Sequence, residues 1–212
     1  ILIPGGTGFI GYHLCKFFIN KRWIVHSVSK SKPKKNRRVK GVKYIHCDVC
    51  NKDELKKKLD VYYDYIINLS GYVDHSKNKS ITRTHYVGCK NLVKNFKKNI
   101  PIKFIQVGSS IEYGKLKSPQ KEVFIKKINT SSTYGDAKLA STLFLLSQYK
   151  KNSFPVSIIR TYLVYGPNQD FNRVIPFVIN KTLTGSTFDC SPGNQLRDFL
   201  FIEDFVKAVD KS

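Results

Sequence analysis

The sequence predicts an α/β protein built on a doubly wound parallel sheet, followed by a small and truncated C-terminal lobe. Three observations predict this fold. Strand-like and helix-like segments alternate along most of the chain. The strand segments are apolar almost throughout, as expected for strands that are covered on both faces. A glycine-rich loop also joins the first strand to the first helix.

Short runs rich in β-branched residues mark the strands, and longer amphipathic runs mark the helices. Asn51 is a candidate cap for the second helix. Strands are expected at 1–3, 23–29, 42–49, 64–71, 102–110 and 156–166, and helices at 9–20, 51–59, 83–98 and 131–151.

The last part of the chain has a different pattern, with loop, helix, loop, strand and helix in that order. We therefore expect a dinucleotide-binding domain at 1–166 and a partial substrate-binding lobe at 167–212. The chain starts inside a strand and stops inside a helix, so we expect that part of the C-terminal region is missing.

The net charge of +22 would suit a nucleic-acid ligand, but lysine scattered along the chain accounts for most of it. Nucleic-acid readers instead cluster arginine with aromatic residues. We interpret the dense basic run at 30–40 as a solvated loop, and we do not expect nucleic acid as a partner. No apolar run approaches the roughly 20 residues that span a bilayer, and no leader is visible. We therefore expect a cytoplasmic protein without a membrane segment.

The five cysteines are odd in number and favour free thiols. Cys47 and Cys50 form a C-x-x-C pair, but no second pair completes a zinc site. No metal is expected.

The loop after the first strand predicts a Rossmann-type dinucleotide site. Gly5, Gly8 and Gly11 recur every three residues between the strand and the helix. This spacing allows a tight turn, close approach to a pyrophosphate and close helix packing, while the helix N-terminus attracts the anion. Phe9 and Ile10, which start the helix, are included among the expected cofactor contacts.

The end of the second strand indicates which dinucleotide is bound. An acidic residue there would bind the ribose hydroxyls of NAD, but this chain has Ser29 and Lys30. A hydroxyl and a cation favour the 2′-phosphate of NADP, although NAD stays possible. Asp48 is expected to meet the adenine ring, and Val49 and Leu69 complete the expected contacts.

Tyr134 and Lys138 lie four positions apart in "STYGDAK". On a helix this spacing places both side chains on one face. The pair alone is compatible with an ordinary surface contact and with a tyrosine that transfers a proton.

Seven motifs together resemble the extended short-chain dehydrogenase/reductase family of sugar-nucleotide epimerases, dehydratases and reductases. They cover the whole chain in order: "GGTGFIG" at 5–11, "CDV" at 47–49, "INLSG" at 67–71, "VGSSIEYG" at 107–114, "YGDAK" at 134–138, "IRTYLVYGP" at 159–167 and "LRDFLFIED" at 196–204. The resemblance implies that Tyr134 is the general acid/base, assisted by Lys138, which also binds the nicotinamide ribose. It also implies that Ser109 hydrogen-bonds the reacting oxygen, with Ser110 close to the substrate.

Departures from the family pattern narrow the expected reaction. The 4,6-dehydratases carry an acidic pair directly after the active-site threonine, where this chain has Ser110 and Ile111. Dehydration is therefore not expected. Glu112 lies one position too late for that role, and its side chain can face elsewhere. His85 stands where the family usually has asparagine, which puts the usual supporting hydrogen bonds in question.

Further departures concern the substrate. Leu163 and Thr161 replace residues that are common in the family, whereas Arg197 in "LRDF" is retained. A guanidinium suits bidentate contact with a substrate diphosphate. The alternative is that Arg197 pairs with Asp198 or Asp204.

The C-terminal half is most similar to CDP-abequose synthase-like reductases of 4-keto-6-deoxy sugar nucleotides. The resemblance therefore implies an NAD(P)-dependent reductase with a nucleotide-sugar substrate, and a homodimer is a possible assembly. A 4-epimerase would use the same residues. An alternative of another class is a non-catalytic relative that senses NADP or binds RNA.

Overall fold

Six parallel strands form the central sheet, in the order β3-β2-β1-β4-β5-β6. The computed structural model describes residues 1–71, 78–122, 130 and 132–212. The strands are β1 (Leu2–Pro4), β2 (His26–Ser29), β3 (Lys43–His46), β4 (Tyr65–Asn68), β5 (Lys103–Val107) and β6 (Val156–Ile159). This is the strand order of a doubly wound dinucleotide-binding fold, so the predicted fold class is confirmed.

Neighbouring residues of the central strands are buried on opposite faces of the sheet. Leu2, Ile66 and Phe104 belong to one apolar cluster, and Ile3, Ile67 and Ile105 belong to the other. Successive side chains of a strand alternate between faces, so apolar residues are needed at every position. Each fully buried side chain of this size is worth about 1.5–3 kcal/mol.

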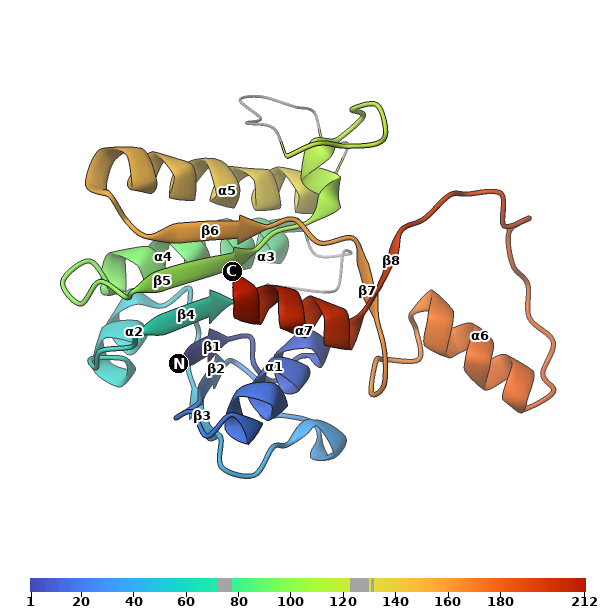
Figure 1. The fold of residues 1–212 in the computed structure, drawn as a ribbon, viewed down its shortest axis with the longest axis horizontal. Helices are drawn as coiled ribbons and strands as arrows, with labels where there is room; N and C mark the ends of the chain where they lie inside the picture. Colours follow the sequence, from blue (N-terminus) through green and yellow to red (C-terminus); the bar gives the residue numbers. More distant parts are fainter. Residues whose placement is uncertain (72–77, 123–129, 131) are drawn as a thin grey trace.

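Helices cover both faces (Figure 1). The first cluster contains side chains from α2 (Lys52–Lys58), α4 (Gly88–Asn95) and α5 (Thr133–Asn152). The second contains side chains from α1 (Phe9–Asn20) and α7 (Ile202–Lys211). Within the described ranges, no helix has both the length and the apolar character required to cross a membrane.

The order in which successive strands are added to the sheet reverses beside β1. This strand pairs with β2 on one side and with β4 on the other. In open parallel sheets, ligands bind in the crevice at the carboxyl ends of the strands at such a switch point. The topology therefore locates the candidate site at the carboxyl ends of β1 and β4.

The predicted strand at 156–166 is wrong as one element. β6 ends at Ile159, and β7 (Leu163–Tyr165) pairs instead with β8 (Phe199–Phe201) in a separate two-stranded parallel sheet. Directly after the end of β6, the Arg160 side chain pairs with Glu112, with 3.1 Å between Nε and Oε2.

The predicted helix at 83–98 is part of a longer and less regular segment. α3 (Asn78–Thr82) leads into a π-helical turn at Arg83–Val87, which leads into α4. π-Helical turns inside helices are frequent at functional sites, and this one carries His85.

The interpretation of 30–40 as a solvated loop is wrong for one residue. Arg37 is only 4% exposed. Its Nε and Nη2 donate to the carbonyl oxygen of Asn168 at 3.0 and 2.6 Å, and its Nη2 lies 3.1 Å from Asp170 Oδ1. The partners lie 131 residues or more later in the chain, so no local pattern indicates this contact.

The predicted C-terminal lobe contributes to two regions of the structure. α6 (Val174–Leu183) has no buried residue and stands away from the sheet, on the side to which the arrowheads of β4 and β6 point (Figure 1). α7 instead packs against α1 in the core, through Ile202, Phe205, Val206 and Val209. The domain division at 166/167 stays a prediction.

The packing of α7 gives a test of stability. Phe205 has 0% exposure, so Phe205→Ala should lower the free energy of unfolding by about 3–5 kcal/mol. Lys211→Ala, on the exposed side of the same helix, should change it by less than about 0.5 kcal/mol. Urea unfolding measures both. Equal effects would show that α7 does not support the core.

Candidate functional site

The glycine loop forms a tight turn at the carboxyl end of β1. Gly5 has φ +84°, and its N–H donates to Val28 O at 2.8 Å. A Cβ on Gly5 would lie 2.7 Å from the carbonyl group of Leu69, and one on Gly11 would lie 2.5 Å from Gly5 O. Both close approaches are to backbone atoms, so glycine is required at both positions.

The N-terminus of α1 fits an anionic group. Its N-cap residue, Gly8, is exposed and provides no side-chain cap, and the first turn contains no acidic residue. The first N–H groups of the helix therefore lack intrahelical partners and carry the positive end of the helix dipole. Phe9 and Ile10 are half-buried in the same turn. These features fit the pyrophosphate of a dinucleotide.

The structure joins two residues that were expected to contact different parts of the cofactor. Lys30 Nζ lies 3.5 Å from Asp48 Oδ2. Burial alone would raise the pKa of Asp48, but the hydrogen bond from the Cys50 N–H and the charge of Lys30 outweigh it, so the pKa is lowered. The Ser29 hydroxyl donates to Val28 O at 2.7 Å.

Two further expected cofactor contacts lie at the same edge of the sheet. Val49 is buried and lies so close to Gly88 that a Cβ there would be 2.7 Å from its Cγ2. Leu69 is half-buried after β4 and donates its N–H to Pro4 O at 2.8 Å.

Lys138 is buried and fixed in place. It is 6% exposed, and its Nζ donates to Val107 O, the last residue of β5, at 2.8 Å. The same Nζ lies 5.8 Å from the centre of the Tyr134 ring. The expected pairing of Tyr134 and Lys138 on one face of α5 is therefore present, with the cation beside the phenol rather than in water.

His85 contacts the other side of this arrangement. Its ring packs edge-to-face on the Tyr134 ring, with 5.1 Å between the centroids. A Cβ on Gly71 would overlap His85 Cε1, so the histidine ring fills the space next to the end of β4. The residue that departs from the family pattern thus touches the predicted acid/base.

Ser109 lies just beyond β5, two residues after the carbonyl that holds Lys138. It is half-buried and caps a 3₁₀ turn at Ser110–Tyr113, where its Oγ accepts from the Ile111 N–H at 3.4 Å. Ser110, also half-buried, donates its N–H to Thr161 O at 2.9 Å. The sheet therefore brings the Ser109 turn and the Lys138 amine to the same carboxyl end.

Glu112 does not face the solvent-accessible part of the site. Its side chain has 0% exposure and forms an ion pair with Arg160. It also accepts from the Thr142 hydroxyl at 2.7 Å. The expectation that Glu112 faces elsewhere agrees with this geometry, and the network around it was not identified from the sequence.

Arg197 is not part of this group in the structure. It lies on the exposed stretch before β8 and donates to Leu196 O at 3.5 Å. Among the described residues, no ion pair joins it to Asp198 or Asp204. The expected substrate contact therefore stays a prediction, and its guanidinium is available to a ligand.

Three of the five cysteines, Cys15, Cys47 and Cys89, are buried. All five are free thiols. Burial raises the pKa of Cys15 and Cys89 to about 12 and that of Cys47 to about 11. No group of three or more His, Cys, Asp or Glu within the described part of the chain could hold a metal ion.

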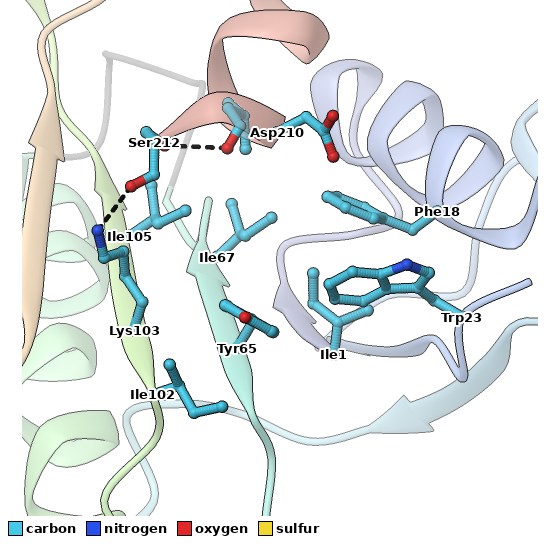
Figure 2. A pocket seen from close by; sticks show the side chains of 11 residues that line it. Ile1, Phe18, Trp23, Tyr65, Ile67, Ile102, Lys103, Ile105, Asp210 and Ser212 are labelled. Atoms are coloured by element: carbon cyan, nitrogen blue, oxygen red, sulfur yellow. Dashed lines mark hydrogen bonds between the residues drawn. The ribbon is translucent and has the colours of Figure 1, made fainter. Parts of the chain in front are cut away.

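A pocket of about 420 Å³ lies at the opposite edge of the sheet. Figure 2 shows its mostly apolar lining, with Phe18 and Trp23 beside Ile1, and Lys103 donating to Ser212 O. It lies at the amino ends of β1, β4 and β5 and contains none of the expected site residues. We therefore assign the candidate site to the carboxyl edge.

Comparisons with known proteins give a family match over the whole chain. Residues 1–212 match the family described as the NAD dependent epimerase/dehydratase family. The chain is 29% identical over 239 residues to dTDP-D-glucose 4,6-dehydratase of Dictyostelium discoideum, covering 99% of this chain and 54% of that protein. It thus spans about half the length of that relative.

Solved structures of sugar-nucleotide epimerases share the fold. UDP-N-acetylglucosamine 4-epimerase from Methanobrevibacter ruminantium, in complex with UDP-N-acetylmuramic acid, matches with a TM-score of 0.84 and 26% identity, over 98% of this chain and 70% of that one. UDP-glucose 4-epimerase from Thermus thermophilus, in complex with NAD, matches with a TM-score of 0.85 and 19% identity, over 99% and 73%.

Proposed function

Since the chain belongs to the NAD dependent epimerase/dehydratase family, we propose that it is an NAD(P)-dependent enzyme that reduces a 4-keto-6-deoxy sugar nucleotide. The observation that carries the proposal is the buried Lys138, which is held by Val107 O beside Tyr134 at the carboxyl end of β5. Burying a cation costs free energy, so its place next to a phenol favours a role in proton transfer.

The roles of the residues follow from this arrangement. A nicotinamide bound at this edge would supply the hydride for the keto carbon. Tyr134 would donate the proton that the carbonyl oxygen takes up as it becomes a hydroxyl. Ser109 would donate a hydrogen bond to the same oxygen, and Lys138 would hold positive charge beside Tyr134. The glycine loop and the uncapped start of α1 would hold the pyrophosphate.

Dehydration has less support, although the relative from Dictyostelium discoideum is a dTDP-D-glucose 4,6-dehydratase. Ser110 and Ile111 occupy the positions of the acidic pair, and neither has a carboxyl group. Glu112 is the nearest carboxylate in sequence, and it is committed to Arg160 and Thr142.

A 4-epimerase is the second candidate, supported by the 26% identical Methanobrevibacter structure. Epimerisation would use Ser109, Tyr134 and Lys138 without an added acid. The two activities differ in stoichiometry. A reductase consumes one NADPH per sugar, whereas an epimerase causes no net oxidation or reduction of its cofactor. A non-catalytic NADP sensor or RNA binder is the less economical alternative, since binding alone would not need all three side chains.

Tyr134→Phe tests the acid/base assignment. The variant should keep its fold and its cofactor affinity but lose turnover by roughly 100-fold or more, because a positioned general acid is removed. Turnover is followed as NADPH oxidation with dTDP-4-keto-6-deoxyglucose and its CDP, GDP and UDP counterparts as probes. Near-normal turnover in the variant would overturn the assignment.

Cofactor choice is a second test. We expect tighter binding of NADPH than of NADH, and Lys30→Ala should weaken NADPH binding by about 10-fold, or about 1.4 kcal/mol, while NADH binding changes little. Lys52→Ala, an exposed lysine on α2, is the matched control. Fluorescence titration with both cofactors gives the affinities, and tighter NADH binding by the unmodified protein would contradict the role of Lys30.

Arg197→Ala is the third test. Loss of a charged hydrogen bond to the substrate diphosphate should cost about 1.5–3 kcal/mol, seen as a higher KM with little change in cofactor affinity. Lys211→Ala serves as the control for loss of a surface cation. If KM is unchanged and only stability falls, Arg197 is a structural residue.

A further inference from the structure

Three elements of the candidate site meet at one buried carboxylate, that of Glu112. We propose that Glu112, kept in place by Arg160 and Thr142, is a positioning residue that sets the location of Ser109 relative to Tyr134 and Lys138. The inference rests on the proposed function, because it assigns Ser109 and Tyr134 to the reaction.

The first contact is to the Ser109 turn. Glu112 Oε1 accepts the backbone N–H of Ser109 at 2.8 Å, which closes a reciprocal cap between the two residues. The carboxylate lies so close beneath the turn that a Cβ on Gly108 would be 2.5 Å from Oε1. The backbone from Gly108 to the Ser109 N–H therefore lies against this oxygen.

The second contact is to the helix that carries the acid/base. Glu112 Oε2 accepts the hydroxyl of Thr142 at 2.7 Å. Thr142 follows Lys138 by four residues and Tyr134 by eight, so all three lie on one face of α5. One carboxylate thus uses one oxygen for the Ser109 turn and the other for the Tyr134 helix.

The third contact fixes the carboxylate itself. Arg160 Nε lies 3.1 Å from Oε2, with side-chain exposures of 13% for Arg160 and 0% for Glu112. The Arg160 guanidinium also stacks over the Tyr113 ring, 5.0 Å from its centre. A buried ion pair of this kind adds little net stability, whereas loss of one partner leaves an uncompensated charge. Its value here is geometric, since it holds the carboxylate at the end of β6.

The expected consequence is selective for the chemical step. A misplacement of about 1 Å in a reacting group can cost about 100-fold in rate. The expected pyrophosphate and adenosine contacts lie on the glycine loop and at the ends of β2 and β3, elements other than the Ser109 turn and α5, so cofactor affinity should change little. A purely structural residue would lower stability without lowering the turnover number of the folded protein.

Thr142→Val is the informative variant, because it keeps the shape and removes only the bond to Oε2. We expect kcat for dTDP-4-keto-6-deoxyglucose reduction to fall about 10-fold, with the NADPH Kd within about twofold of the unmodified protein. Glu112→Gln should lower kcat about 100-fold. Ser147→Ala, which removes a hydroxyl bonded to Phe144 O on the same helix, should leave kcat unchanged.

Crystal structures of the NADPH complexes provide a second readout that needs no turnover. The separation between Ser109 Oγ and Tyr134 Oη should change by at least about 0.5 Å in Thr142→Val. A normal kcat with an unchanged separation overturns the inference. If the protein turns over none of the probes, or if Tyr134→Phe stays active, the proposed function fails, and the separation alone then decides whether Glu112 positions Ser109.

Discussion

Burial of β1, β4 and β5 on both faces is the constraint on which the other features depend. The pairs Leu2 and Ile3, Ile66 and Ile67, and Phe104 and Ile105 divide between two apolar clusters, so helices must cover both sides of the sheet. Because helices cover both faces, a ligand reaches these strands at their amino ends or at their carboxyl ends. At the carboxyl edge, backbone groups and the N-terminus of α1 are available, and the strand order switches beside β1, which is where ligands bind in open parallel sheets.

Lys138 and Glu112, two charged groups buried near this edge, are paired in ways that constrain geometry. Lys138 is held by the carbonyl oxygen of Val107, and Glu112 is held by Arg160 and by two hydrogen-bond donors. A buried charge without partners would cost several kcal/mol. Both networks meet at the end of β5, which explains how a strand of five residues can orient a turn and a helix at once.

The packing of α7 and the contacts of Arg37 both attach the later part of the chain to the rest of the domain. α7 completes the core beside α1, and Arg37 binds the backbone of Asn168 and the carboxylate of Asp170. Between these anchors, β7 and β8 form their own small sheet and α6 projects without buried residues. The loop beside the expected adenosine contacts is therefore tied to the start of the segment expected to cover the substrate.

Features that depend on one short stretch of chain were determined by the sequence alone. The glycine spacing at 5, 8 and 11, the apolar strands and the Tyr134–Lys138 spacing each follow from local geometry, and the fold agrees with them. The tertiary structure decided the rest: the end of β6 at Ile159, the burial of Arg37, the Lys30–Asp48 pair and the network around Glu112. Each of these depends on a partner from another element, such as Arg160 for Glu112, 48 residues away. Local periodicity reports which face a side chain occupies, whereas the partner that stabilises a buried charge is decided only when the strand order brings distant segments together.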